Sequence, residues 1–441
     1  MLDIKYIREN KDLVANAIEK KRVKIGRSYG GVSTVLSGQE AIELLLEIDK
    51  RRRDLQNQLD ILRAERNRLS EMIGKSSGEQ KLEMVKRASE CKKELEKLEP
   101  ELEGIEKDFN DLMLRIPNVP AEDVPIGISD EDNKEIRRWG EIRKFDFRPR
   151  DHVELGEMLD IIDIPRGVKV AGTRNYYLKN EGALIELALL RYSLDFLIKK
   201  GFIPFLVPHM VKDDAMIGSG FFPGGEEQAY RLERDSLNLI GTSEVSLVSY
   251  HSNEVLDIEE LPKLYVGLSY CFRREAGTYG RDTRGLYRLH QFQKVEQVIL
   301  CENSAEVSRQ MHNMILNNSE DILKALNLPY RVVVVCTGEM GQGQVYKNDI
   351  ETWMPSRNNY SETHSCSTLH EFQSRRLNIR YRGKDGIVRY VHTLNNTAIA
   401  SPRILIPILE NYQQEDGSVI IPEVLRPYMN GLEIIKPRKI S

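Results

Sequence analysis

The sequence has no apolar run that approaches the roughly 18 residues needed for a membrane-spanning helix. Its first residues, MLDIKYIRENKDLV, mix acidic and basic side chains and lack the apolar core of a signal peptide. Secretion and membrane insertion are therefore not expected, and we predict a cytoplasmic protein with no membrane partner.

Cysteine is scarce, and the spacing of the cysteines does not indicate that they form a common site. The chain has five cysteines and no CxxC pair, which in a long chain is typical of reduced thiols in a cytosol. His364, Cys366 and His370 lie close together, but one short loop rarely supplies a whole metal site and no fourth ligand is evident. We therefore expect no zinc. The chain also lacks a GxxxxGK[ST] phosphate loop, so it would have to bind a nucleotide in another way.

An excess of one charge is also missing. Lys and Arg number 64 against 68 Asp and Glu, and the net charge of −4 neither requires nor excludes a nucleic-acid partner, because binding depends on local patches.

A chain of 441 residues with 40% hydrophobic residues can form two or three domains with a sizeable core. Its strand-like runs do not alternate regularly with helices, which disfavours a doubly wound parallel sheet.

A long helical hairpin is predicted near the N-terminus. A stripe of residues, apolar except for Arg52 and Arg66, recurs at alternating steps of four and three over residues 48–73 and again over 84–112, which is typical of a coiled coil. The Gly- and Ser-rich residues 74–78 favour a tight turn, so the two arms should be antiparallel. Pro117 and Pro120 end the second arm.

The amino-acid composition of this hairpin does not decide its role. Its first arm is basic, which fits a solvated helix face, an arm that follows a phosphate backbone, or a dimerisation arm. Among its basic residues are Arg51, Arg53, Arg63 and Arg66.

The most informative stretch, residues 271–298, reads CFRREAGTYGRDTRGLYRLHQFQKVEQV. An Arg-x-Glu at the end of an apolar strand places Arg273 and Glu275 on the same face. Such a guanidinium can clamp a phosphate or a carboxylate through paired hydrogen bonds. A glycine- and arginine-rich loop follows and could close over a polyanion.

FRREAG, GRDTRGL and HQFQKVE together resemble motif 2 of class II aminoacyl-tRNA synthetases, in the version found in seryl-tRNA synthetases. The resemblance extends over essentially the whole chain. The other matching segments are motif 1 at 201–211, the serine-binding Thr-x-Glu at 240–247, the ATP and metal segment at 349–376, motif 3 at 392–413 and the C-terminal signature at 419–431.

The resemblance implies an α+β protein. Residues 1–118 would form an N-terminal tRNA-binding domain whose long antiparallel hairpin covers about 40–112. Residues 119–441 would form a class II catalytic domain, an antiparallel sheet flanked by helices. The implied reaction joins L-serine to ATP as seryl-adenylate and then moves serine to the 3′ end of tRNA(Ser), with tRNA(Sec) open as a second substrate. The implied cofactor is Mg²⁺, and the implied assembly is a homodimer that binds tRNA across its subunits.

The resemblance also assigns site residues, with Arg273 and Arg403 as the catalytic arginines. ATP would be bound by Arg273, Arg274, Glu275, Leu289, His290, Gln291, Phe292, Glu362, Thr363, His364, Ser365 and Arg403. Serine would be bound by Thr242, Ser243, Glu244, Arg273, Glu296, Asn395 and Thr397. Magnesium would be held by Glu362 and Ser365 together with ATP, and tRNA by Arg51, Arg53, Arg63 and Arg66.

The chain departs from the family's usual residues at Ser361, at Thr363 and His364, at Asn396 and at Pro402. These positions bear on the nucleotide side of the site. Two other functions remain open: a paralogue that delivers serine or a similar amino acid to another acceptor, and an inactive RNA-binding module. The hairpin argues against the first. The retained acidic and basic site residues argue against the second, because buried charges are costly unless paired.

Overall fold

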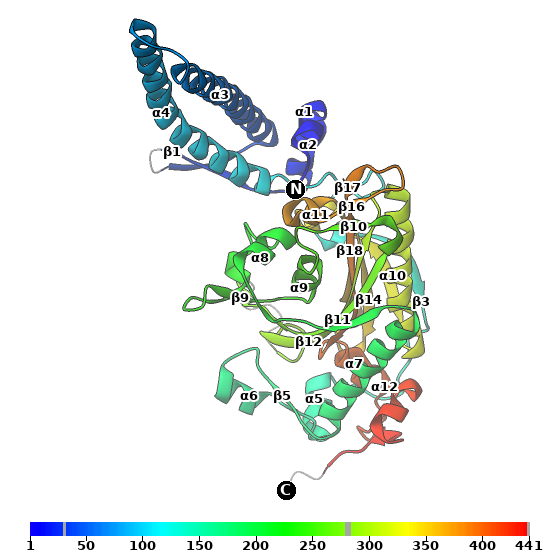
Figure 1. Ribbon diagram of the computed structural model, residues 1–441. Coiled ribbons are helices and arrows are strands. Elements are labelled where there is room, and N and C mark those ends of the chain that lie inside the picture. The colour runs from blue at the N-terminus through cyan, green and yellow to red at the C-terminus, as the bar shows by residue number, and fades with distance from the viewer. Residues whose placement is uncertain (30–31, 278–283, 439–441) are drawn as a thin grey trace. The chain divides into compact units, whose positions relative to one another are not determined.

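The computed structural model describes residues 1–29, 32–277 and 284–438. The chain forms two compact units, Met1–Val119 and Pro120–Ser441, and each is described by itself (Figure 1). No helix in the described ranges combines the length and the apolar character needed to cross a membrane.

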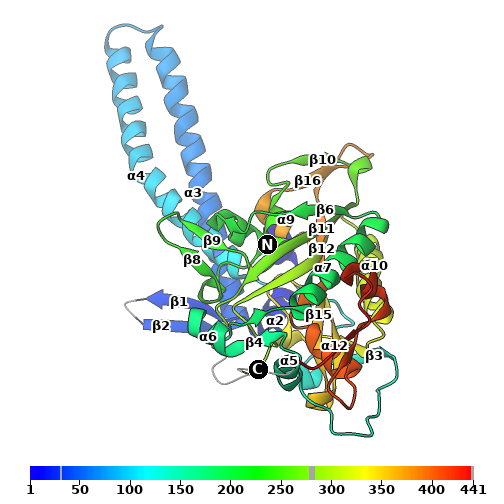
Figure 2. The same ribbon diagram turned by 90° about the horizontal axis from the view of Figure 1, so that it is seen from below.

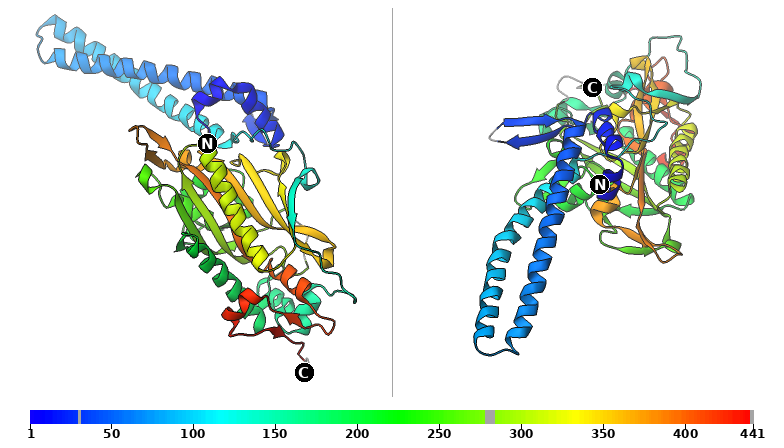
Figure 3. Two further views of the ribbon diagram at one scale, coloured as in Figure 1. Left: turned by 90° about the vertical axis from the view of Figure 1, so that its right-hand side faces the viewer. Right: turned by 90° about the horizontal axis from the view of Figure 1, so that it is seen from above.

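The first unit is built around two long helices that fold back on each other (Figures 1 and 3). Its elements are α1 (Ile4–Glu9), α2 (Lys11–Lys20), the antiparallel pair β1 (Ile25–Tyr29) and β2 (Val32–Leu36), α3 (Gly38–Ile73) and α4 (Glu79–Arg115).

The sequence explains where the hairpin begins and what holds it. Ser37 and Glu40 form a capping box at the start of α3, in which each side chain accepts the other residue's backbone N–H. Leu59 and Leu95 are almost fully buried in the seam between the helices. Burial of that apolar stripe confirms the predicted antiparallel coiled coil.

The second unit contains an eight-stranded sheet in the order β3-β13-β14-β15-β18-β12-β11-β6 (Figures 1 and 2). Neighbouring strands are antiparallel except for β11 and the edge strand β6, which are parallel. In this order the strands are Lys134–Trp139, Tyr330–Val334, Tyr346–Met354, Asn359–His370, His392–Ser401, Gln291–Cys301, Lys263–Phe272 and Ile203–Leu206.

Smaller elements surround this sheet. Its helices are α5 (His152–Met158), α6 (Ile164–Ala171), α7 (Glu181–Lys199), α8 (Asp213–Ser219), α9 (Glu244–Ser249), α10 (Ala305–Ala325), α11 (Phe372–Leu377) and α12 (Leu405–Tyr412). The short strands are β4 (Ile162–Asp163) with β5 (Tyr177–Leu178), β7 (Met210–Val211) with β9 (Leu237–Leu239) and β8 (Tyr230–Leu232), β10 (Val255–Asp257) with β16 (Arg380–Arg382) and β17 (Val388–Tyr390), and β19 (Val419–Ile420) with β20 (Ile434–Ile435).

Helices α7 and α10 cover one face of the sheet, and the left view of Figure 3 shows α10, in yellow, lying along the strands in front of that face. Val295 and Ile299 of β12 are fully buried on this side. Asn396 of β18 points the same way and donates hydrogen bonds to the Ile315 carbonyl at 2.6 Å and to Ser319 at 2.8 Å. The opposite face is mixed: toward α9 it buries Val298 and Leu300 of β12 in a second apolar cluster, and beside that cluster it carries polar side chains. This architecture confirms the predicted α+β class.

Candidate active site

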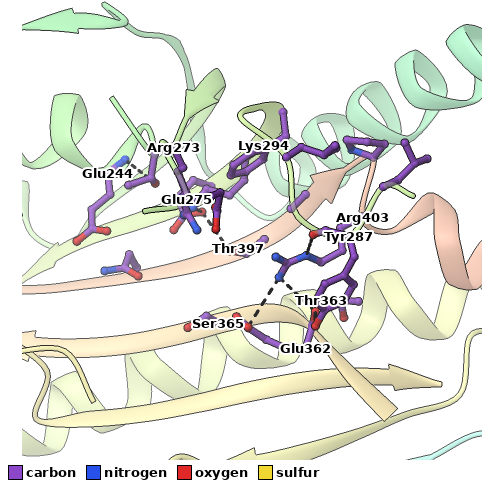
Figure 4. A pocket seen from close by; sticks show the side chains of 18 of the residues that line it. Glu244, Arg273, Glu275, Tyr287, Lys294, Glu362, Thr363, Ser365, Thr397 and Arg403 are labelled. Carbon is purple, nitrogen blue, oxygen red and sulfur yellow. Dashed lines mark hydrogen bonds and ion pairs between the residues drawn. The ribbon is translucent and has the colours of Figure 1, made fainter. Parts of the chain in front are cut away.

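A pocket of about 270 Å³ opens on the face of the sheet opposite α10 (Figure 4). Alternation along β12 directs Phe292, Lys294 and Glu296 into it, because every second side chain of a strand points to the same face. Asn395 and Thr397 enter from β18, whose register places Thr397 opposite Glu296.

Two β-bulges decide which side chains reach the pocket from the other strands. In β15, Thr363 is the extra residue opposite Ile350 and Glu351 of β14. The bulge turns Glu362 and Ser365 to the same face, although residues three apart in a regular strand point to opposite faces. A second bulge lies between β12 and β18, next to Glu296.

One end of the pocket holds two buried carboxylates. Burial raises the pKa of Glu244 to about 7, and the nearby Glu296 carboxylate adds to the shift. Burial also raises the pKa of Glu296, although Lys294 opposes the shift from 2.5 Å away. Thr397 donates a hydrogen bond to Glu296 at 3.4 Å, and Gln373 donates one to Glu244 at 2.7 Å. This end therefore favours a ligand that brings a positive charge and hydrogen-bond donors.

Arg273 lies between the two ends. Its guanidinium is 5.1 Å from the centre of the Phe292 ring and donates to the Gly241 carbonyl at 3.3–3.4 Å. Glu275 forms an ion pair with Arg288 at 3.0 Å. Both Arg273 and Glu275 line the pocket, but they follow β11 and do not belong to it, and Glu275 has a positive φ of 52°. The prediction that a strand aligns them was therefore wrong: a loop brings them together.

The other end combines a cation, an aromatic ring and a carboxylate. The Arg403 guanidinium lies 4.4 Å from the centre of the Tyr287 ring and donates to the Tyr287 carbonyl at 3.0 Å. It is 3.8 Å from the Glu362 carboxylate. Burial by itself would raise the pKa of Glu362. The positive charges of Arg403 and Lys347 outweigh that effect and hold the pKa below its usual value. Glu362 is therefore ionised at neutral pH.

The oxygen atoms beside Glu362 bear on metal binding. Ser365 lines the pocket, and Asp349 stands opposite it in β14. Burial raises the pKa of Asp349 to about 6, and Lys347 pairs with it at 3.0 Å. Carboxylate and hydroxyl oxygens suit Mg²⁺ when phosphates complete its coordination. Within the described ranges no group of three or more His, Cys, Asp or Glu side chains is arranged to hold a metal by itself.

Most of the predicted site residues meet in this pocket. Those that line it are Thr242, Glu244, Arg273, Glu275, Leu289, Phe292, Glu296, Glu362, Thr363, Ser365, Asn395, Thr397 and Arg403.

Five predicted residues do not line the pocket. Ser243 is fully buried against Gly267 of β11. Arg274 and Gln291 are exposed beside the site. His290 donates from Nδ1 to the Arg273 carbonyl at 3.0 Å. His364 is buried, where it bonds to Thr363 and the Ala398 carbonyl, and burial lowers its pKa to about 4.

The pocket also has walls that the sequence did not indicate. Lys294 lies between two predicted residues on the same strand, so alternation alone could have identified it. Pro402 was noted as a departure from the family's usual residue on the nucleotide side, and nothing in the sequence pattern marks the others, which are Phe221, Leu286, Tyr287, Lys347 and Ala400.

The predicted arginines of the hairpin lie in the first unit, where Arg51 and Arg63 form exposed ion pairs and Arg66 donates to the Asn67 side chain. Arg51 pairs with Glu101 at 2.7 Å and Arg63 with Glu99 at 2.9 Å, each across the two helices. Arg53 pairs with Asp49 within α3. The exposed pairs of Arg51 and Arg63 are weak and can exchange partners, so these two guanidinium groups remain accessible to an anionic ligand. The Asp49 carboxylate is buried, so the pair of Arg53 is not of this kind.

Comparisons with known proteins agree with this geometry. Residues 32–120 match the family model of the seryl-tRNA synthetase N-terminal domain, and residues 230–412 match that of the tRNA synthetase class II core domain (G, H, P, S and T).

Individual relatives match over their full length. The serine–tRNA ligase of Deinococcus radiodurans is 44% identical over 99% of both chains, and that of Dictyoglomus thermophilum is 46% identical over 100% of both. A crystal structure of seryl-tRNA synthetase from Pyrococcus horikoshii complexed with ATP is similar with a TM-score of 0.90 and 40% identity, covering 100% of both chains. The resemblance drawn from the sequence motifs is thereby confirmed.

Proposed function

Since this chain belongs to the seryl-tRNA synthetases, we propose that its pocket converts L-serine and ATP into seryl-adenylate and then releases serine to the 3′ end of tRNA(Ser). The observation that carries this proposal is the division of one pocket into two ends. Two buried carboxylates, Glu244 and Glu296, suit an amino acid, while Arg403 and Tyr287 suit a nucleotide. Arg273 lies where the two substrates would meet.

Serine would enter at the carboxylate end. Its ammonium group would pair with Glu244 and Glu296, and its hydroxyl would exchange hydrogen bonds with the polar side chains from β18. Alanine lacks the hydroxyl and would leave buried polar groups unpaired, which costs about 1–3 kcal/mol per group. Threonine differs by one methyl group, which a pocket rejects by only about 1–3 kcal/mol, so its exclusion must be steric.

ATP would lie with its base over Phe292 and its outer phosphates toward Arg403. The serine carboxylate then attacks the α-phosphorus, the bond to the β-phosphate oxygen breaks, and pyrophosphate leaves. Negative charge builds up on the α-phosphate oxygens in the transition state. The Arg273 guanidinium would stabilise it, and one such group is typically worth about 100-fold or more in rate. Positioning and charge supply the catalysis, and no histidine carries a proton.

Glu362 and Ser365 would hold Mg²⁺ with the phosphates of ATP. Their oxygens fit that ion, and the lowered pKa of Glu362 keeps its carboxylate charged. The bound ion would neutralise phosphate charge. Arg403 would orient the same phosphates from the Tyr287 side.

The hairpin of the first unit would bind the backbone of tRNA(Ser) through its exposed arginines. The same enzyme would also accept tRNA(Sec), which a charging assay with that RNA tests directly. Because phosphate contacts release counterions, tRNA charging should weaken with salt more steeply than adenylate formation does.

A homodimer would cover the exposed edge of the sheet. Leu206 of β6 is 84% exposed and Ile203 is 52% exposed, and Leu187 of the adjoining α7 is 59% exposed. An apolar edge strand of this kind invites pairing with a second chain. We place the dimer, with tRNA bound across its subunits, in the cytoplasm.

The test is amino-acid-dependent ATP–pyrophosphate exchange with each of the standard amino acids, followed by charging of tRNA(Ser). Exchange and charging with serine support the proposal. Serine exchange without charging would point to another acceptor. No exchange with any amino acid would leave an RNA-binding role as the better explanation.

A further inference from the structure

A buried glutamine, Gln373, stands behind the carboxylate end of the active-site pocket. It is the second residue of α11 and is fully buried. Its side-chain amide donates a hydrogen bond to the Glu244 carboxylate at 2.7 Å. Gln373 is not among the described residues that line the pocket. Any influence of Gln373 on a bound substrate must therefore pass through Glu244.

The surroundings of Gln373 fix the direction of its amide. The Thr393 hydroxyl donates to the amide oxygen at 2.6 Å, and the amide nitrogen donates to the Ser219 carbonyl at 2.9 Å as well as to Glu244. A carbonyl and an ionised carboxylate only accept hydrogen bonds, so a flipped amide would set oxygen against oxygen at both contacts. Both hydrogens of the nitrogen are used, and Gln373 can only donate to Glu244.

These contacts form a small network of buried residues from four elements. Glu244 is the first residue of α9, Ser219 is the last residue of α8, and Thr393 belongs to β18. Thr393 lies two residues before Asn395, so alternation places it on the face of β18 that carries the serine end of the pocket. The network therefore holds the Gln373 amide from three sides.

Charged groups from other elements also face Glu244. Burial raises the pKa of Glu244 to about 7, and Glu296 of β12 adds to the rise. The Gln373 hydrogen bond is the largest effect that opposes this rise, ahead of the charges of Lys294 of β12 and Arg273. Within the described ranges no other side chain donates a hydrogen bond to the Glu244 carboxylate. The amide is thus the contact that sets both its direction and its charge.

We propose that Gln373 is a positioning residue for serine, which holds the Glu244 carboxylate in the direction and the charge state that receive the ammonium group of the substrate. The inference rests on the proposed function. Because the amide only donates, it occupies one carboxylate oxygen, favours the ionised form and leaves the other oxygen for the ammonium group. Thr393 acts one step further back, by keeping the amide from turning.

Four variants test the network, one of them a matched control. Gln373→Met removes the amide with little change in volume, Thr393→Val removes the hydroxyl that orients it, and Thr393→Ser keeps that hydroxyl. The control is Gln297→Met. Gln297 is also fully buried, but its amide donates to the Ile315 carbonyl and to Ser319 on the α10 side of the sheet. The KM values for serine and for ATP are measured by ATP–pyrophosphate exchange between pH 7 and 9.

At pH 7 we expect Gln373→Met to raise the KM for serine about 10-fold, the lower end of what a hydrogen bond to a charged group contributes. The KM for ATP and kcat should not change, because the lost contact serves serine binding alone. The ratio of variant to wild-type KM should fall toward pH 9. Without its donor Glu244 has a still higher pKa, and a higher pH restores its charge.

The other variants separate positioning from packing. Thr393→Val should raise the KM for serine less than Gln373→Met does, and Thr393→Ser should restore the wild-type value. Gln297→Met should lower Tm and leave both KM values unchanged. An unchanged KM for serine in Gln373→Met, a KM ratio that is the same at every pH, or an equal rise in the Gln297→Met control would overturn the inference.

The empty enzyme supplies a readout that needs no activity. Glu244→Gln should raise Tm at pH 8 more in the Gln373→Met background than in the wild type, because the carboxylate without its donor is more costly to ionise. Thr393→Val allows the same comparison if Gln373→Met does not fold. An equal gain in both backgrounds would overturn the inference. A wild type that fails to exchange serine would instead refute the proposed function, so the two failures are distinguishable.

Discussion

Replacing Glu244 by Gln should stabilise the empty enzyme while weakening serine binding. Glu244 is 8% exposed, and burial raises its pKa from 4.5 to about 7. The unfolded chain releases this proton near pH 4.5, whereas the folded chain retains it until about pH 7. The folded state therefore loses stability as pH rises through this window, and the full cost is present above pH 7.

The size of the stability gain follows from the raised pKa of Glu244. At pH 8 the raised pKa lowers the free energy of unfolding by about 3 kcal/mol, and Glu244→Gln restores it because the amide does not ionise. The catalytic unit spans residues 120–441, so at about 2.1 cal/mol/K per residue its unfolding entropy is about 0.7 kcal/mol/K. The variant should thus melt about 4 °C above the wild type at pH 8 and close to it at pH 4.5.

Serine binding should change in the opposite sense. Loss of a charged partner for the ammonium group costs about 2 kcal/mol, or roughly a 30-fold higher KM for serine in ATP–pyrophosphate exchange. Glu186→Gln is the matched control, because burial also raises the pKa of Glu186 to about 7 and this residue lies outside the pocket. The control should reproduce the pH-dependent gain in Tm with an unchanged KM. Parallel Tm curves for wild type and Glu244→Gln between pH 5 and 8 would refute the reasoning.

Three further outcomes are expected. Arg273→Ala should lower serine-dependent exchange by about 100-fold or more with an unchanged circular dichroism spectrum, and a near-normal rate would contradict its role at the α-phosphate. Replacing residues 51–103 of the hairpin by a short glycine linker should abolish tRNA charging and leave exchange intact, since the described residues that line the pocket all belong to Pro120–Ser441; equal loss of both would count against the assignment. Lys294→Met should raise the pKa of Glu296, so that exchange falls at pH 7 and recovers as pH rises; a uniform loss at every pH would argue against this pairing.

The sequence predicted the hairpin well because its signal is local. Residues such as Leu59 and Leu95 recur at the spacing that keeps one helical stripe buried, and the turn between the arms has a composition of its own. Two of the three β12 residues that line the pocket were predicted: Phe292 and Glu296 were identified from the motif, but Lys294 between them was not. Alternation would have placed all three on one face.

Other parts of the site could not be predicted, because they depend on strand register. His364 stands within a matched segment, yet the bulge at Thr363 sends Glu362 and Ser365 to the pocket and His364 to the interior. Asn396 departs from the family's usual residue beside the active site, but it faces α10 and touches no part of the pocket. The alternation of residue types along one strand does not reveal where a β-bulge shifts its register against the neighbouring strand.

The arrangement along β12 explains why one strand can serve both substrates. Phe292, Lys294 and Glu296 point into the pocket at intervals of two residues. At about 3.3 Å per residue, the first and last lie about 13 Å apart along the strand, comparable with an extended aminoacyl-adenylate. Phe292 would fix the nucleotide end and Glu296 the amino end, while Lys294 limits the cost of burying Glu296. Because the distance is set by a central strand bonded on both sides to β11 and β18, it cannot relax without breaking the sheet. A rigid spacing of this kind places the serine carboxylate at the α-phosphate before the reaction begins, which is where positioning contributes most to the rate.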